Sequence, residues 1–199
     1  MLFVVFTAVY WNHFDNGFHF DDSHAIESNL YVKDLSYFKQ YFTDAATHSS
    51  LPTNQAYRPM LTLSFAIDHW MAGNRLDPFY FHVSTFIWVI LQAFLMFFMF
   101  RWILERSARR PIANAVSLFA VAWYLLHTAN AETINYISAR SDILSTVPVV
   151  LALIIYQRTQ GAWRFLALPV LAFGILVKPT TVMFVAILFV HSLLFEENR

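Results

Sequence analysis

Two adjacent carboxylates, Asp21 and Asp22, follow a short apolar stretch at the start of the chain, within the sequence FHFDD at residues 18–22. Charged side chains beside apolar segments are costly to keep near lipid, so they usually serve a function. A carboxylate in this setting can remove a proton from a hydroxyl group. We therefore take Asp21 and Asp22 as candidate catalytic residues, with the alternative that Asp22 is the N-cap of a helix beginning near His24.

The overall composition indicates a membrane protein. Hydrophobic residues make up 58% of the 199 residues and charged residues only 13%, against roughly 45–50% and about 25% in soluble domains. So few charges cannot coat a soluble surface, and we predict an all-α polytopic integral membrane protein. The formal net charge of zero gives no indication of a nucleic-acid partner, and the absence of cysteine excludes disulfides and thiolate sites.

The apolar segments predict about six membrane spans, of which the first is truncated. Residues 1–11 are apolar but shorter than the ~20 residues that a spanning helix needs, and they lack the features of a signal peptide. We interpret them as the end of a first span, and the whole of residues 1–199 as a single membrane domain, a fragment of a larger fold. The other predicted spans are residues 79–103, 112–126, 144–156, 165–177 and 181–195.

Residues 12–78 form the most polar part of the chain, and we predict a large first loop there that carries interfacial helices. Asp34 is placed to cap a short amphipathic helix whose apolar face includes Phe38 and Tyr41. Such a helix would lie in the plane of the membrane interface. Pro59 is suited to the first turn of a second short helix over residues 60–71.

Basic residues in short loops predict the orientation, because such loops remain in the cytoplasm. The basic loops contain Arg101, Arg106, Arg109, Arg110, Arg158 and Arg164. Alternation of the spans then places residues 12–78, residues 127–142 and Lys178 together on the non-cytoplasmic side. The candidate site residues thus share one face: Asp21, Asp22, Arg58, His127, Glu132, Arg140, Asp142 and Lys178.

This mixture of charges is suited to an anionic substrate. Arg58, Arg140 and Lys178 could stabilise a phosphate leaving group while a carboxylate removes a proton from an incoming hydroxyl. Each cation has an alternative role. Arg58 and Lys178 could extend to lipid headgroups, and Arg140 could form a structural ion pair.

The remaining polar residues of this face are assigned supporting roles. His127 is interpreted as an interfacial hydrogen-bonding residue, and Glu132 and Asp142 as supporting acids. Ser141 or Asp142 could instead cap a helix that enters the membrane at Ile143. No set of His, Asp and Glu has metal-site spacing, so we expect no obligatory metal, although Asp21 and Asp22 could ligate a divalent cation through their oxygens.

Several motifs occur in a characteristic order along the chain. They are FDD at residues 20–22 followed by Ala25, Ile26 and Asn29, YRPM at residues 57–60, His82-Val83, His127, Glu132, and YISARSDIL at residues 136–144. This succession resembles the membrane part of the transmembrane and tetratricopeptide-repeat O-mannosyltransferases, whose pattern is HP-x-x-x-E-A-x-x-Y-I-x-x-R-x-D-L-L. The chain has Thr128 in place of the proline, and Pro179 where glutamate commonly follows the lysine.

The resemblance implies a C-type membrane glycosyltransferase. Such an enzyme would transfer a sugar, mannose in this family, from a polyprenyl-phosphate donor to a hydroxyl of a polypeptide serine or threonine at the non-cytoplasmic face. Asp21, with Asp22, would be the general base. The membrane would be that of the endoplasmic reticulum in a eukaryote and the inner membrane in a bacterium.

Two other functions stay open. One is an inactive truncated relative, or a subunit that binds lipid phosphate without catalysis. The other is a transporter, which the sequence disfavours because its unusual polar residues lie at one surface and none lies in mid-span.

Overall fold

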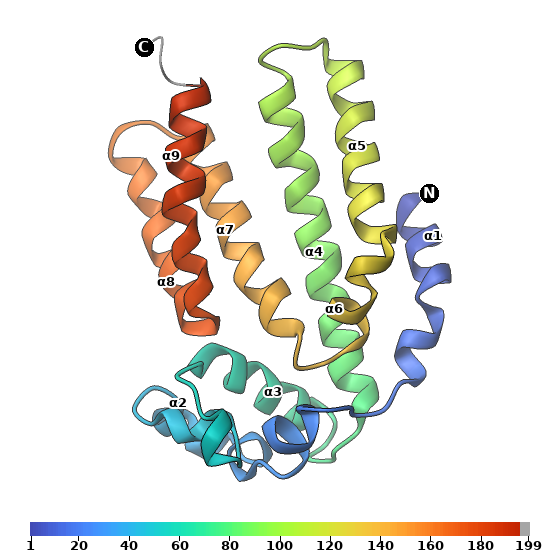
Figure 1. Ribbon diagram of the computed structural model, residues 1–199, viewed down its shortest axis with the longest axis vertical. Helices are drawn as coiled ribbons and strands as arrows, with labels where there is room; N and C mark the ends of the chain where they lie inside the picture. Colours follow the sequence, from blue (N-terminus) through green and yellow to red (C-terminus); the bar gives the residue numbers. More distant parts are fainter. Residues whose placement is uncertain (196–199) are drawn as a thin grey trace.

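The computed structural model describes residues 1–195, and every regular element in that range is helical. The longer helices run alongside one another as a bundle, and a layer of short helices covers one end of it (Figure 1). The bundle helices are α1 (Leu2–Val9), α4 (Pro78–Leu104), α5 (Arg110–Leu126), α7 (Arg140–Arg158), α8 (Ala167–Val177) and α9 (Phe184–Phe195). The connecting turns are η7 (Thr128–Asn130), η8 (Gly161–Leu166) and η9 (Pro179–Met183), together with α6 (Ala131–Asn135).

Two helices in residues 1–195, α4 and α7, are both long and apolar enough to cross a membrane. A third span is obtained if α5 and the segment Thr128–Asn135 count together, although they are bent by 54° at the break between them. The segments Gly161–Val177 and Pro179–Leu194 are apolar but shorter. The helical class is therefore confirmed, whereas the six predicted spans are not.

The bundle is held by apolar packing inside and carries apolar side chains outside. Helix α7 packs against α4 and α8, and α4 packs against α5. Phe86 and Val89 of α4 form a buried cluster with Val121 of α5 and Phe6 of α1. Large apolar side chains also stay exposed on the outer faces of α5 and α9: Ile112, Val116, Phe119, Trp123, Val185, Phe189 and Leu194. These outer faces fit a lipid environment, in which apolar exposure has no cost.

Gly174 of α8 is the point of closest approach between α8 and its neighbours. A Cβ atom added there would lie 2.7 Å from Cγ of Pro148 in α7 and 2.7 Å from Cγ2 of Thr181 in η9. Contacts this short cannot be relieved without moving backbone or a proline ring. The packing of α7, α8 and η9 therefore requires a residue without a side chain at this position.

We expect Gly174→Val to destabilise the protein by about 1–3 kcal/mol, the usual cost of overpacking a well-packed interior. The measurement is thermal unfolding in detergent or nanodiscs. Gly17→Val is the matched control, because a Cβ atom at Gly17 has nothing within 4 Å. If both variants unfolded at the wild-type temperature, the close approach at Gly174 would be refuted.

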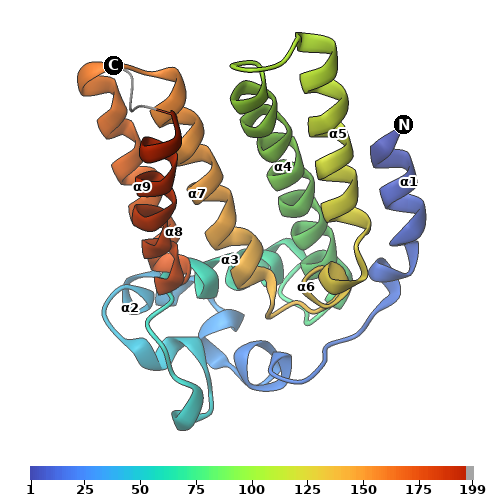
Figure 2. The ribbon, with the colours of Figure 1, turned by 45° about the horizontal axis from the view of Figure 1, so that its top comes forward.

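The layer of short helices, which we call the cap, comprises the residues between α1 and α4 (Figure 2). Its elements are η1 (Trp11–Asp15), η2 (Ser23–Glu27), η3 (Leu30–Lys33), η4 (Leu35–Tyr37), α2 (Phe38–Tyr41), η5 (Ala45–His48), η6 (Pro52–Asn54) and α3 (Pro59–Met71). Two local predictions are confirmed. Oδ1 of Asp34 accepts a hydrogen bond of 2.8 Å from the backbone N–H of Ser36, and Pro59 is the first residue of α3.

The cap is joined to the bundle by a second buried cluster. Ile26, Leu61 and Phe65 of the cap pack against residues of the bundle and of the segment that enters it: Phe81, Ile137, Leu144 and Val177. The loop between α4 and α5 and the loop between α7 and α8 lie at the opposite end of the bundle, while the turn between α8 and α9 lies near the cap (Figures 1 and 2). The cap and the segment 127–142 therefore meet at one end of the molecule.

Candidate functional site

A pocket of about 380 Å³ lies where the cap meets the start of α7. Its charged and titratable lining residues are Asp21, His24, His48, Arg58, Glu132, Tyr136 and Asp142. The structure thus brings four of the predicted site residues, Asp21, Arg58, Glu132 and Asp142, to one cavity from separate parts of the chain. The pocket is the candidate active site.

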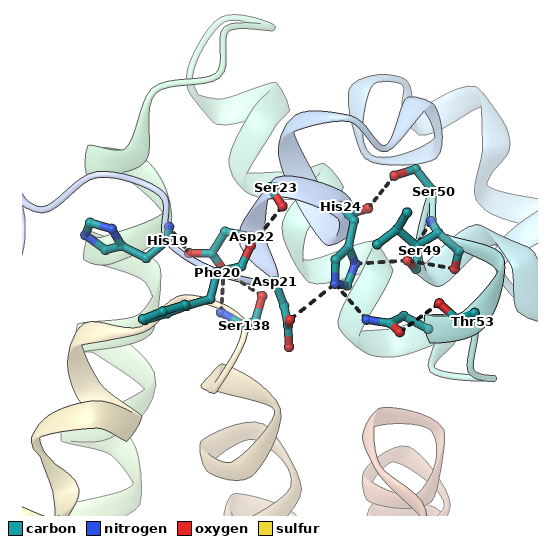
Figure 3. Close-up of polar contacts among 12 residues, drawn as sticks. His19, Phe20, Asp21, Asp22, Ser23, His24, Ser49, Ser50, Thr53 and Ser138 are labelled. Carbon is teal, nitrogen blue, oxygen red and sulfur yellow. Dashed lines mark hydrogen bonds and ion pairs between the residues drawn. The ribbon is translucent and has the colours of Figure 1, made fainter.

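Asp22 is a buried anchor between the cap and the segment that precedes α7. Its side chain is fully buried, and Oδ2 accepts a hydrogen bond of 3.0 Å from the backbone N–H of His19. Oδ1 accepts bonds of 2.9 and 2.6 Å from the backbone N–H and hydroxyl of Ser138 (Figure 3). Burial raises the pKa of the Asp22 carboxyl, and these hydrogen bonds act in the opposite direction. Asp22 occupies the N-cap position of η2, as the capping alternative expected, but its side chain makes no capping hydrogen bond there.

Asp21 presents its carboxylate to the pocket, in contrast to Asp22. Its backbone N–H donates to the hydroxyl of Tyr136 at 2.9 Å, and its side chain is 62% exposed. The preceding Phe20 has φ of 47°, in the left-handed region that L-residues other than asparagine and aspartate rarely adopt. This turn lets two neighbouring carboxylates diverge, one inward as an anchor and one toward the pocket.

Arg58 and His48 contribute nitrogen atoms that lack protein partners. Within residues 1–195, Nε of Arg58 and Nδ1 of His48 are buried without a hydrogen-bond partner. Burial, followed by the positive charge of Arg58, lowers the pKa of His48 to about 4, so His48 is neutral at physiological pH. A buried polar group without a partner is costly, and a ligand in the pocket could supply the missing acceptors.

Lys178 and Asp142 form an ion pair at the pocket. Asp142 and Ser141 lie in the first turn of α7, which begins at Arg140, so the prediction that either of them caps a helix at Ile143 is wrong. His127 lies outside the pocket, where its Nδ1 accepts a 3.1 Å bond from the backbone N–H of Ala129. This contact agrees with its interpretation as a hydrogen-bonding residue, and its location at the membrane interface stays a prediction.

Arg140 does not reach the pocket, and its proposed contact with the donor phosphate is wrong. Its side chain is fully buried, with Nε donating to the hydroxyl of Thr85 at 2.8 Å. The terminal nitrogens bind the carboxylate of Asp68 and the backbone carbonyl of Phe81. The alternative of a structural ion pair is therefore confirmed. Its partner, Asp68, was missed, although it is the only acidic residue in the apolar segment 60–71.

A joint cation site on Asp21 and Asp22 does not form. Both oxygens of Asp22 accept hydrogen bonds from His19 and Ser138, while the Asp21 carboxylate points elsewhere. Across residues 1–195, no group of three His, Asp or Glu side chains is arranged to hold a metal ion. Our expectation that the protein has no obligatory metal stays a prediction.

Sequence comparisons identify relatives of this chain among known proteins. Human TMTC3, named a protein O-mannosyl-transferase, is 25% identical over 162 residues, covering 79% of this chain and 16% of the relative. Human TMTC4 is 26% identical, covering 72% and 20%, and Drosophila melanogaster Tmtc1 is 26% identical, covering 76% and 17%. The chain resembles the membrane part of the TMTC proteins. It spans about a sixth of the length of TMTC3, and neither a family model nor a solved structure matches it.

The predicted resemblance to the TMTC proteins is therefore confirmed. The pocket residues that were not predicted include His24, His48 and Asn54. His24 follows Asp21 by three positions, a spacing that brings side chains together on one helical face. That spacing could have indicated the pair. His48 and Asn54 come from separate turns of the cap, and no local pattern marks them.

Proposed function

We propose that the chain carries the donor- and acceptor-binding end of a protein O-mannosyltransferase. In this proposal, mannose is transferred from a polyprenyl-phosphate carrier to a serine or threonine hydroxyl of a polypeptide at the non-cytoplasmic face. The bond between the sugar C1 and the phosphate oxygen breaks, and a bond between C1 and the acceptor oxygen forms. The hydroxyl proton passes to a carboxylate, and polyprenyl phosphate leaves.

The observation that carries this proposal is the position of Asp21. Its carboxylate is exposed in a pocket where the cap meets the start of α7, while the neighbouring Asp22 holds the loop in place. A general base must be accessible to the hydroxyl that it deprotonates, and its support must be rigid. Of the two carboxylates, only Asp21 meets the first condition.

Arg58 and Lys178 remain the phosphate-binding candidates after the exclusion of Arg140. Arg58, whose buried Nε has no hydrogen-bond partner, lines the pocket, and the neutral His48, which also lines it, can donate a further hydrogen bond. Lys178 is held at the pocket by Asp142. Charged donors of this kind stabilise a phosphate leaving group by charge-assisted hydrogen bonds.

We expect Arg58→Ala and Lys178→Ala each to weaken binding of polyprenyl-phosphate mannose by more than about tenfold, since a charged hydrogen bond is worth about 1.5–3 kcal/mol. The measurement is an equilibrium binding titration with the full-length protein in nanodiscs. Arg75→Ala is the control, because Arg75 is exposed and lies outside the pocket. An equal loss in all three variants would indicate general electrostatic attraction and contradict a specific site.

The alternative function, a subunit that binds lipid phosphate without catalysis, shares the donor-binding result. The two functions differ in the transfer assay, because for a non-catalytic subunit the Asp21→Asn substitution would leave the rate of mannosyl transfer unchanged. We propose an integral membrane location, in the endoplasmic reticulum if the organism is eukaryotic and in the inner membrane if it is bacterial.

A further inference from the structure

His24 connects Asp21 to two other turns of the cap. It lies in η2, where its Nε2 is 3.3 Å from Oδ1 of Asp21. The same Nε2 is 2.9 Å from the amide nitrogen of Asn54, and Nδ1 is 2.9 Å from the hydroxyl oxygen of Ser49 (Figure 3). The imidazole is thus held on both nitrogens, behind the carboxylate that we assign as the base.

The surrounding hydrogen bonds determine the tautomer of His24. The hydroxyl of Ser49 donates to the backbone carbonyl of Leu51 at 3.2 Å, so its oxygen is free to accept the Nδ1–H of His24. Thr53 donates its hydroxyl to Oδ1 of Asn54 at 3.2 Å, which directs the amide N–H of Asn54 toward Nε2. Neutral His24 therefore carries its proton on Nδ1 and presents a lone pair at Nε2.

This arrangement leaves an acceptor facing an acceptor. With Asp21 ionised and His24 neutral, Oδ1 and Nε2 meet at 3.3 Å without a proton between them. The uptake of one proton at Nε2 converts this contact into a charge-assisted hydrogen bond, while the hydrogen bond from the Asn54 amide to Nε2 is lost. Proton uptake therefore exchanges a neutral hydrogen bond for a stronger, charge-assisted one.

We propose that Asp21 and His24 act together as a single proton acceptor, with His24 as a positioning residue that acts through Asp21. The proposal rests on the transferase function given above. As the acceptor oxygen bonds to C1 and the phosphate departs, the hydroxyl proton moves to Asp21 and is then shared with Nε2 of His24. The Nδ1–H of His24 stays on the ring, hydrogen-bonded to the hydroxyl oxygen of Ser49, so His24 becomes an imidazolium and no further reactant is needed.

Titratable and charged groups from several elements surround this pair. His48 of η5 and Arg58 line the same pocket. Glu132 and Asp142 line it as well, and Asp142 is paired with Lys178. Asn54 and Ser49, which contact His24 directly, do not titrate.

The test is the substitution His24→Gln in the full-length protein. Glutamine can donate a hydrogen bond to Asp21 and so hold the carboxylate, but it cannot accept a proton. We expect kcat for mannosyl transfer to fall about 10- to 100-fold, with KM for the donor within about twofold of wild type. His19→Gln is the control, because the His19 side chain points away from Asp21 and its backbone is unchanged (Figure 3).

The pH profile separates proton uptake from simple support of the loop. An imidazole generally takes up a proton near pH 6.5 and a carboxylate near pH 4. Loss of the imidazole should therefore move the acidic limb of the kcat profile to lower pH by about one unit or more. A structural role for His24 would lower kcat without moving this limb.

Each outcome decides the proposal. A lower kcat with a displaced acidic limb supports it. Wild-type kcat in His24→Gln, or a lower kcat with an unmoved limb, overturns it while the proposed function stands. Normal transfer by Asp21→Asn in the same assay overturns the proposed function itself, and the pair with it.

Discussion

We expect Asp21→Asn to lower the rate of mannosyl transfer by about 10²–10⁴-fold, the usual effect of removing a general base. Binding of polyprenyl-phosphate mannose should stay close to wild type, because the base acts on the acceptor hydroxyl and not on the donor. The fold should tolerate the change, since the Asp21 carboxylate is mostly exposed and the new side chain has nearly the same shape. The measurement pairs a transfer assay with a donor-binding titration on the full-length protein.

Asp15→Asn is the matched control, since Asp15 is an exposed acid at the end of η1 in the cap and lies outside the pocket. Near-normal turnover in the Asp21 variant would remove Asp21 from catalysis and favour a subunit that binds lipid phosphate. Loss of donor binding along with turnover would instead assign Asp21 to the donor.

The second large effect is expected at the buried ion pair between Arg140 and Asp68. Removing one partner leaves an uncompensated charge inside the protein, which typically costs about 3–5 kcal/mol. Asp68→Leu should therefore lower the unfolding temperature strongly, because Arg140 is fully buried and also holds Phe81 and Thr85 of α4. Thermal unfolding in nanodiscs measures the effect.

The double variant Asp68→Leu with Arg140→Met tests this explanation. Replacement of a buried pair by apolar side chains of similar size is often neutral or stabilising, so most of the lost stability should return. If the double variant were as unstable as the single variant, the packing of α3 on α4 would matter more than the charge. Asp15→Leu should leave the unfolding temperature unchanged.

Features that depend on short stretches of sequence could be predicted well. The apolar runs predicted the positions of α4, α5 and α7, because the period and length of an apolar helix are local properties. The N-cap hydrogen bond of Asp34 and the start of α3 at Pro59 likewise depend only on neighbouring residues. The number of spans could not be predicted as well from the sequence, because the shorter apolar helices are not long enough to cross a bilayer on their own.

The sequence by itself determined the helical membrane class, the resemblance to the TMTC proteins, and the gathering of polar residues at one end. Tertiary structure decided which of those residues are available for chemistry. Arg140 and Asp22 carry the same charges as Lys178 and Asp21, yet burial and hydrogen bonding make the first two structural anchors. The contacts of His24 with Ser49 and Asn54 join residues 25 and 30 positions apart. Such contacts depend on how the cap folds. The environment of a charged side chain decides whether it is a structural anchor or available for chemistry, and residue type alone does not give that environment.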